Sequence, residues 1–204
     1  MPIHIVGSND CITNLAEANG FFWETLWNHP DNQTLKDLRK DPNVLAEFDE
    51  VFIPDLTPKD EDGATEAKHR FRKKGVPALV RLCIKIDDEP IANTPCTLVV
   101  DGNSTDLTTD GDGFIEMPLP PGAQSGELRI KQPRSTTLFQ LMFGRLDPIE
   151  SEPGVVQRLK SLGFGLSSPE ELDAAVGAFR KKHGMGEGGI DDSFRSKLES
   201  EFGQ

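Results

Sequence analysis

Residues 154–202 read GVVQRLKSLGFGLSSPEELDAAVGAFRKKHGMGEGGIDDSFRSKLESEF and contain three apolar patterns with the spacing of a helix face. The three sets are Val155, Leu159 and Leu162, then Leu172, Val176 and Phe179, then Phe194, Leu198 and Phe202. Each set predicts a short amphipathic helix. Because three such helices bury one small core, the stretch predicts a three-helix module over residues 153–204.

Capping residues separate the three predicted helices. Gly163 and Gly184 follow the first two apolar patterns, where a glycine commonly ends a helix. Ser168-Pro169-Glu170-Glu171 has the S-x-x-E pattern of a capping box, with proline at the first helical position. Asp191 precedes the third pattern and predicts the N-cap of the last helix.

The same residues carry a family resemblance. Gln157-Arg158-Leu159, Leu162-Gly163, Ala174-Ala175-Val176, His183-Gly184 and Gly189-Ile190-Asp191 resemble the peptidoglycan-binding type 1 domain, a three-helix module found beside many cell-wall hydrolases. The resemblance implies a cell-wall reader that holds a glycan or a stem peptide. The alternative is that the module is a helical dock for a protein partner.

The composition bounds the class of protein. The chain has 204 residues, 36% of them hydrophobic, which permits packed cores, and its 7% aromatic content with no tyrosine predicts that each core is small. The net charge of −12 argues against binding to nucleic acid or to anionic membranes. Three cysteines, an odd number, fit a reducing compartment. No secretory signal and no apolar run of about 20 residues are visible, so we expect cytoplasmic synthesis without a signal peptide.

Residues 1–56 predict a small α+β unit. His4-Ile5-Val6 predicts a strand, Asp10 the cap of a helix that ends at Gly20, and Val51-Phe52-Ile53 a closing strand. A second helix is expected around Trp23 and Trp27, and residues 34–40 add a further helical turn. The predicted order is strand, helix, helix, strand, with the two strands forming one sheet under the helices.

This unit resembles a LysM domain, through the residues of 10–16, Trp27-Asn28-His29-Pro30 and 51–54. LysM domains bind glycans that contain N-acetylglucosamine, in a groove between the loop before the first helix and the loop before the last strand. Carried onto this chain, the groove residues are Asp10, Cys11, Asn28, Ala46 and Glu47. The chain departs from the family at Cys11, where threonine is usual, and at Ala46-Glu47-Phe48, which replaces a Tyr-Pro-Gly turn. The extra length between Asn28 and Val44 is expected to cover or reshape the groove.

Aromatic and basic residues near this unit have two interpretations. Trp23 and Trp27 either belong to the core, which their spacing favours, or stack on a sugar ring. Residues 57–77 predict a polar linker that ends in the basic cluster of residues 69–75. That cluster is either a solvated segment neutralised by nearby acids or a dock for an acidic partner. His29 and His69 lack the spacing of zinc ligands.

Residues 78–132 alternate apolar and polar side chains between turn signals, which predicts a small antiparallel β-sandwich. Asp101-Gly102 predicts a hairpin turn. Pro90-Ile91-Ala92-Asn93, residues 109–113 and residues 119–123 resemble the transthyretin-like or carboxypeptidase-regulatory domains that are often appended to bacterial injection-system spike proteins.

Two features of the sandwich region could indicate a binding site or a cross-link. Asp110-Gly111-Asp112-Gly113 has acidic oxygens, but the twelfth position of an EF-hand loop starting at Asp110 is Pro121, so we interpret it as a glycine-rich turn and predict no metal site. Cys83 and Cys96 are placed to face each other across a hairpin, and they are either paired or, by default, buried free thiols.

Residues 133–152 predict a connector between the sandwich and the helices. Its apolar part, residues 138–143, is either an exposed interface or the last strand of the β-domain. The fold class is therefore multidomain α+β, with a LysM-like unit, a β-sandwich and a three-helix module.

The sequence contains no catalytic constellation. Gly-x-Ser-x-Gly, His-Glu-x-x-His and phosphate-binding loops are absent from it, so we expect no enzymatic activity and no cofactor. With these three modules in one chain, the protein resembles small proteins of type VI secretion and related contractile injection systems. The three resemblances imply a non-catalytic adaptor whose partners are peptidoglycan, spike or tail proteins, or an effector, with delivery to the periplasm or cell wall by the injection machinery. The alternative is a recognition subunit of a separately encoded cell-wall hydrolase or injected effector.

Overall fold

The computed structural model describes residues 3–8, 10–57, 62–69, 78–86, 88–120, 122–132, 135–144, 146–166 and 168–203. It confirms a mixed helix and strand protein with small antiparallel sheets. The chain divides into two compact units: Met1–Asn43 with Glu47–Arg145, and Val44–Ala46 with Leu146–Gln204. Residues 58–61 and 70–77 lie outside the described part of the chain, and the second range includes most of the predicted basic cluster, residues 69–75.

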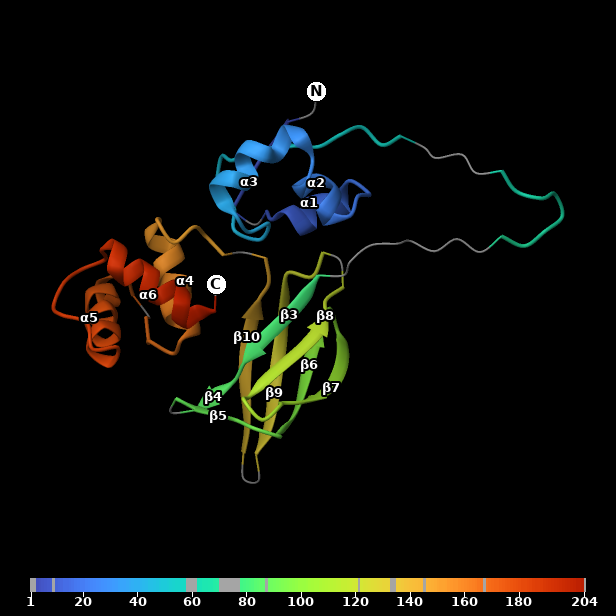
Figure 1. Ribbon diagram of the computed structural model, residues 1–204. Helices are drawn as coiled ribbons and strands as arrows, with labels where there is room; N and C mark the ends of the chain where they lie inside the picture. Colours follow the sequence, from blue (N-terminus) through green and yellow to red (C-terminus); the bar gives the residue numbers. More distant parts are fainter. Residues whose placement is uncertain are drawn as a thin grey trace. The chain divides into compact units, whose positions relative to one another are not determined.

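The N-terminal part of the first unit has the predicted order of strand, helix, helix and strand, with an additional helix before the last strand (Figure 1). Its elements are β1 (Ile3–Ile5), α1 (Ile12–Ala18), α2 (Trp23–Trp27), the 3-10 helix η1 (Pro30–Asn32), α3 (Gln33–Arg39) and β2 (Glu50–Phe52). Strands β1 and β2 are antiparallel, with Ile3 opposite Phe52 and Ile5 opposite Glu50. The extra length in the sequence is therefore a full helix, α3, rather than a single turn.

A buried asparagine joins the helices of this part to its sheet. The side-chain amide of Asn32 donates hydrogen bonds to the carbonyl oxygens of Leu26 and Phe52, both at 2.9 Å, and its Oδ1 accepts one from the Phe52 N–H at 2.7 Å. Trp27 is buried and belongs to the core, as its spacing favoured, whereas Trp23 is half-buried. Asn32 thus binds one backbone group of α2 and two of β2.

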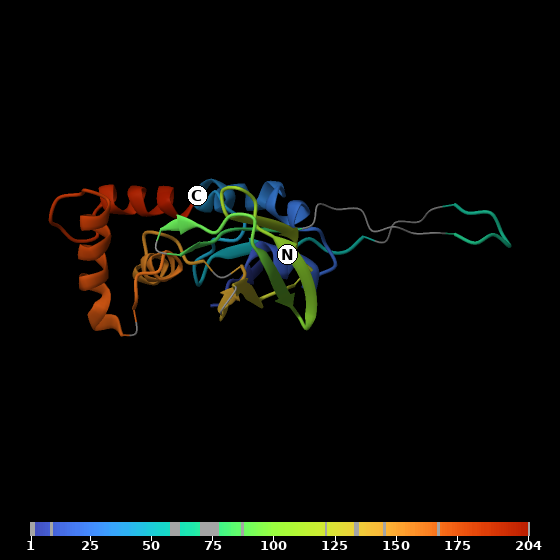
Figure 2. The ribbon, with the colours of Figure 1, turned by 90° about the horizontal axis from the view of Figure 1, so that it is seen from below.

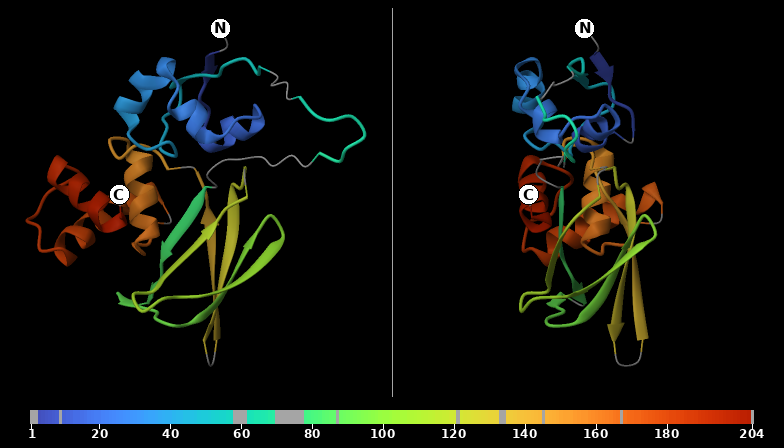
Figure 3. Two further views of the ribbon diagram at one scale, coloured as in Figure 1. Left: turned by 45° about the vertical axis from the view of Figure 1, so that its right-hand side comes forward. Right: turned by 90° about the vertical axis from the view of Figure 1, so that its right-hand side faces the viewer.

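The central part of the first unit is built from eight antiparallel strands. They are β3 (Leu79–Cys83), β4 (Lys85–Ile86), β5 (Glu89–Pro90), β6 (Pro95–Val100), β7 (Asn103–Thr108), β8 (Phe114–Pro118), β9 (Ser125–Gln132) and β10 (Ser135–Met142). One sheet has the order β10-β9-β6-β7, and β3 pairs with β8 in a second layer that lies over it (Figures 1 and 3). Apolar side chains of both layers, among them Val80, Leu98, Ile115 and Leu128, form one core.

Local turn chemistry explains the hairpins of the sandwich. Asp101 and Gly102 join β6 to β7 with φ angles of 48° and 78°, and two positive φ values match a two-residue type I′ turn. The apolar residues 138–143, left open between an exposed interface and a last strand, lie largely in the edge strand β10, which pairs along its whole length with β9.

The proposed facing of Cys83 and Cys96 is wrong. Cys83 pairs with Phe114 in the β3–β8 sheet, whereas Cys96 lies in β6 between Leu107 and Ile130 of the four-stranded sheet. Both thiols are free, Cys96 buried and Cys83 exposed.

The second unit contains the three predicted helices, α4 (Glu152–Ser161), α5 (Leu172–Lys182) and α6 (Asp192–Phe202), whose axes cross steeply rather than running parallel (Figure 2). Gly163 and Gly184 take positive φ angles of 84° and 65° directly after α4 and α5, as predicted for C-terminal caps. The Asp191 carboxylate accepts a hydrogen bond from the Phe194 N–H at 2.8 Å and caps α6. The S-x-x-E segment at Ser168 opens a 3-10 turn, Pro169–Glu171, with proline at its first position as predicted, and α5 follows with Glu171 as its N-cap.

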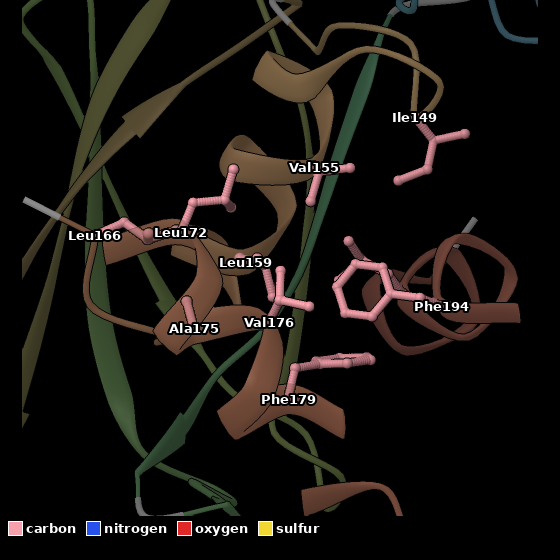
Figure 4. Close-up of a cluster of buried hydrophobic side chains, with 10 residues drawn as sticks. Ile149, Val155, Leu159, Leu166, Leu172, Ala175, Val176, Phe179 and Phe194 are labelled. Atoms are coloured by element: carbon pink, nitrogen blue, oxygen red, sulfur yellow. The ribbon is translucent and has the colours of Figure 1, made fainter. Parts of the chain in front are cut away.

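The core of the helical module joins residues from all three helices (Figure 4). Phe179 and Phe194 meet edge to face with ring centroids 5.1 Å apart, and Val155, Leu159 and Val176 surround them. The side chain of Arg158 is also buried, with only 1% of its surface exposed, and its Nη1 donates to the carbonyl oxygens of Asp147 and Gly154 at 2.8 and 2.9 Å. The Arg158 guanidinium is therefore buried in the module and satisfies backbone carbonyls there.

Candidate functional site

The strongest candidate site lies around the start of α1, where two loops of the N-terminal part meet. One loop runs from Gly7 to Cys11 and follows β1, and the other runs from Lys40 to Asp49 and precedes β2. The Ile12 N–H donates to the Pro42 carbonyl at 3.0 Å, and the Val6 N–H donates to the Asp49 carbonyl at 2.9 Å. These bonds bring together two segments that are more than 25 residues apart in the sequence.

Asp10 organises the first loop. Its Oδ2 accepts a hydrogen bond from the Gly7 N–H at 2.9 Å and lies 2.8 Å from the Nε2 atom of His4. Both side chains remain partly exposed. The prediction that Asp10 caps α1 is wrong, because Cys11 is the N-cap residue. The Asp10 carboxylate instead closes the turn before the helix and presents its remaining acceptor sites to solvent.

Cys11 faces the interior of this part. Its side chain is 4% exposed, and its N–H is satisfied by the Asn14 Oδ1 atom at 2.9 Å. Burial raises the pKa of the Cys11 thiol, which keeps the group neutral. Of the two adjacent groove candidates, Asp10 is the one whose polar atoms reach the surface.

The second loop covers the first turn of α1. Besides the Pro42 bond, the Thr13 hydroxyl donates to the Asn43 Oδ1 atom at 3.2 Å, and the Asn43 N–H is held by Asp41 Oδ1 at 2.7 Å. Lys40 enters this segment with a left-handed φ of 62° directly after α3. The residues after Asn28 thus place backbone against the N-terminal turn of α1.

The remaining predicted groove residues lie in three different surroundings. Asn28 ends α2, and its Oδ1 atom accepts a hydrogen bond from the Lys36 ammonium of α3 at 2.6 Å. Ala46 is half-buried and belongs to the second compact unit. Glu47 is exposed and stands directly before the segment that pairs with Val6. The surface groups at the junction of the two loops are therefore Asp10, Asn43 and Glu47.

Phe48 is a residue that the sequence pattern did not single out. Its N–H donates to the Val6 carbonyl at 2.9 Å, its φ is 71°, and its side chain is 79% exposed. The sequence signal was that Phe48 stands just before a predicted strand, at the glycine position of the Tyr-Pro-Gly turn that Ala46-Glu47-Phe48 replaces. The left-handed backbone and the exposure are visible only in three dimensions.

A separate open groove of about 410 Å³ lies at the other end of the β1–β2 sheet. It is lined by Ile3, His4, Asn19, Ile53, Pro54, Asp55 and Leu56. None of the predicted groove residues lines it. His4, which lines the groove, also contacts Asp10, so the groove adjoins the predicted LysM-like site without including its residues.

The Asp110 segment of the sandwich forms the expected turn. Its Oδ1 atom accepts hydrogen bonds from the N–H groups of Asp112 and Phe114 at 2.9 and 2.8 Å. Gly113 has a φ of 81°, and a Cβ there would stand 2.8 Å from the Ile84 carbonyl oxygen, so only glycine fits. Among the residues that the structure describes, no three His, Cys, Asp or Glu side chains are grouped to hold a metal ion.

The C-terminal module uses its charged residues to hold its own loops. Arg180 donates to the carbonyl oxygens of Gly186 and Gly189 at 2.7 and 2.8 Å, and its Nη1 lies 3.1 Å from the Asp191 carboxylate. Asp191 in turn accepts from the Ser193 hydroxyl at 2.7 Å, and these bonds lower its pKa to about 2. This network fixes the 184–191 loop against α5 and supports folding of the module.

No protein-family model, curated protein sequence or solved structure matches this chain. Within the described ranges, none of the helices has the length and apolar character needed to cross a membrane.

Proposed function

We propose that the chain is a non-catalytic binding protein that engages a glycan containing N-acetylglucosamine, such as peptidoglycan, at the junction of the two loops around α1. The observation that supports this is the junction itself: the 7–11 loop and the segment of Phe48 and Asp49 are tied to Val6 and Gly7. Asp10, Asn43 and Glu47 place carboxylate and amide groups there, and such groups hydrogen-bond sugar hydroxyl and acetamido groups.

The net charge of the protein indicates which interactions contribute to its affinity for peptidoglycan. Peptidoglycan is largely anionic and the chain carries a net charge of −12, so long-range attraction does not contribute. Affinity must come from short-range hydrogen bonds and ring contacts. Binding of this kind changes little between low and moderate salt, because screening affects mainly exposed charges that are far apart.

Co-sedimentation of the full-length protein with isolated sacculi at two salt concentrations tests the proposal. We expect binding at both concentrations and weaker binding of Glu47→Ala. Glu116→Ala, which removes an equally exposed carboxylate from β8, is the matched control and retains binding. Failure of the wild-type protein to sediment with sacculi at either salt concentration would contradict the proposal.

We further propose that the protein serves as an adaptor of a contractile injection system of the type VI class. Support comes from the three sequence resemblances in one chain, a LysM-like unit, a transthyretin-like sandwich and a peptidoglycan-binding-like helical module. On this proposal the terminal modules contact the wall or a tail component, and the sandwich links them. Deletion of the gene is expected to impair assembly, firing or effector delivery, and unchanged delivery would contradict it.

A second candidate function is that of a recognition subunit for a separately encoded wall hydrolase or an injected effector. The edge strand β10 favours it, because Leu138 and Met142 are exposed on an uncharged strand that pairs on one side with β9. This function predicts that the protein co-purifies with a lytic enzyme from its own host. Purification of each protein without the other would count against it.

A further inference from the structure

Phe48 holds an unusual backbone position. The N–H of Phe48 and the carbonyl oxygen of Asp49 both bond to Val6, so that two residues of one strand oppose one residue of the other. This is a β-bulge, and its first residue, Phe48, has a φ of 71°. The first position of a bulge with this conformation is normally glycine, because a Cβ in left-handed backbone meets the following carbonyl oxygen. Phenylalanine is therefore strained at this position.

The side chain of Phe48 gives the fold no compensating burial. At 79% exposure it is the most exposed large apolar side chain among the described residues, ahead of Leu38 and Leu56 at 63%. Glycine at position 48 would relieve the backbone and remove an apolar ring from water. A strained conformation and an exposed ring at one residue together indicate a role outside the stability of this chain.

Hydrogen bonds hold the bulge beside the junction of the two loops around α1. Arg39 binds the carboxylate of Asp49 through two hydrogen bonds of 2.8 Å, which fixes the residue after Phe48. Val6, the partner of the bulge, is followed by Gly7, whose N–H is held by the Asp10 carboxylate. Phe48 thus follows exposed Glu47 and is tied through Val6 to the loop that carries Asp10.

We propose that Phe48 is the platform on which a sugar ring of the glycan stacks, an inference that rests on the proposed glycan-binding function and names its principal contact. The C–H groups on one face of an N-acetylglucosamine ring carry a small positive charge and approach the negative face of an aromatic ring. Glu47 and Asp10 then supply acceptors for the hydroxyl and amide groups at the ring edge. Because this contact needs no net charge, it suits an acidic protein that binds an anionic polymer.

Titration of the full-length protein with a β-1,4-linked N-acetylglucosamine tetramer, in parallel with thermal unfolding, tests the inference. Phe48→Gly is expected to raise the unfolding midpoint, because it relieves the left-handed strain, and to weaken tetramer binding by about tenfold or more. Phe48→Trp retains a flat ring and is expected to keep the affinity. A gain in stability with a loss of binding is a combination that a purely structural residue would not produce.

Two variants serve as matched controls. Glu66→Gly relieves a left-handed φ of 64° outside the two loops without removing a ring, so it should leave binding unchanged. Leu38→Ala removes a comparably exposed apolar side chain from α3 and tests for non-specific adhesion. A binding loss with either control that equals that of Phe48→Gly would overturn the inference.

The outcomes separate this inference from the function on which it rests. Equal binding by wild-type protein and Phe48→Gly overturns the stacking role, leaves glycan binding intact and points to Phe48 as a contact for a protein partner. A lower unfolding midpoint in Phe48→Gly also overturns it, because the ring would then stabilise the fold. Absence of tetramer and sacculus binding by the wild-type protein overturns both proposals.

Discussion

Arg39 and Asp49 form a bidentate ion pair that joins the last turn of α3 to the β-bulge at Phe48, directly before β2. The Nε and Nη2 atoms of Arg39 each lie 2.8 Å from a different carboxylate oxygen of Asp49, and both side chains are mostly buried. Parallel hydrogen bonds of this kind fix orientation as well as distance. The pair therefore decides where the residues before β2 lie relative to the helices.

Asp49→Asn is expected to destabilise the protein by about 1–3 kcal/mol, because it removes the negative charge that accepts two hydrogen bonds from Arg39. Arg39→Met should cost a similar amount. Since both variants remove the same interaction, the double variant should cost less than the sum of the two. Denaturant unfolding of the four proteins measures this coupling, and strictly additive effects would show that the pair contributes nothing of its own.

Two helical glycines should respond in opposite ways to alanine. A Cβ at Gly154 in α4 would stand 2.0 Å from the Pro148 carbonyl oxygen and 2.6 Å from that of Asp147, whereas a Cβ at Gly177 in α5 meets no atom within 4 Å. Gly177→Ala should therefore stabilise the protein by about 0.5–1 kcal/mol, the ordinary helix preference. Gly154→Ala should destabilise it by about 2 kcal/mol or more through overpacking.

Thermal unfolding followed by circular dichroism measures both glycine variants under identical conditions. The two substitutions make the same chemical change in helices of the same module, so each is the control for the other. A shift of the same sign in both variants would refute the close approach of α4 to the 147–148 segment.

Asp191 should make the stability of the helical module depend on pH in the acid range. Hydrogen bonds from Ser193, from the Phe194 N–H and from Arg180 lower its pKa from 3.8 to about 2. Because the folded state binds the proton less readily than the unfolded state, the contribution is complete above about pH 4 and is lost as the pH falls towards 2. The unfolding midpoint should fall over that range.

Asp191→Asn keeps a side-chain oxygen for the cap of α6 but does not titrate, so it should reduce the slope of the midpoint between pH 4 and 2. Asp173→Asn, which removes an exposed carboxylate from the first turn of α5, is the control and should leave the slope nearly unchanged. An unaltered slope in Asp191→Asn would show that other carboxylates carry the acid sensitivity.

The three cysteines should react at two different rates. Cys83 is exposed, whereas Cys11 and Cys96 are 4% and 2% exposed, and burial raises the pKa of both buried thiols. Thiolate is the reactive form, so Ellman's reagent near pH 8 should label one thiol rapidly and the other two slowly. All three should react at once in denaturant, and Cys83→Ser should lack the fast phase. Rapid labelling of two or three thiols in the folded protein would contradict the burial of Cys11 or Cys96.

Features that depend on neighbours in the chain could be predicted from the sequence. The periodic apolar residues of α4, α5 and α6, the caps at Gly163, Gly184 and Asp191, and the Asp101-Gly102 turn all follow from propensities within a few residues. The S-x-x-E pattern at Ser168 marked the start of a 3-10 turn before α5. Prediction failed at Cys83 and Cys96, whose strands joined different sheets. Strand partners are chosen by long-range pairing, which a local pattern does not encode.

The sequence by itself determined the α+β class, the order of most elements and the three-helix pattern, because helix periodicity and turn chemistry are local. Tertiary structure alone decided that β10 completes a sheet, that Arg158 is buried on backbone carbonyls, and that alanine cannot replace Gly154. It also placed Phe48 in left-handed backbone with its ring in water. These properties depend on which distant segments come into contact, and the contacts form only when the whole chain packs.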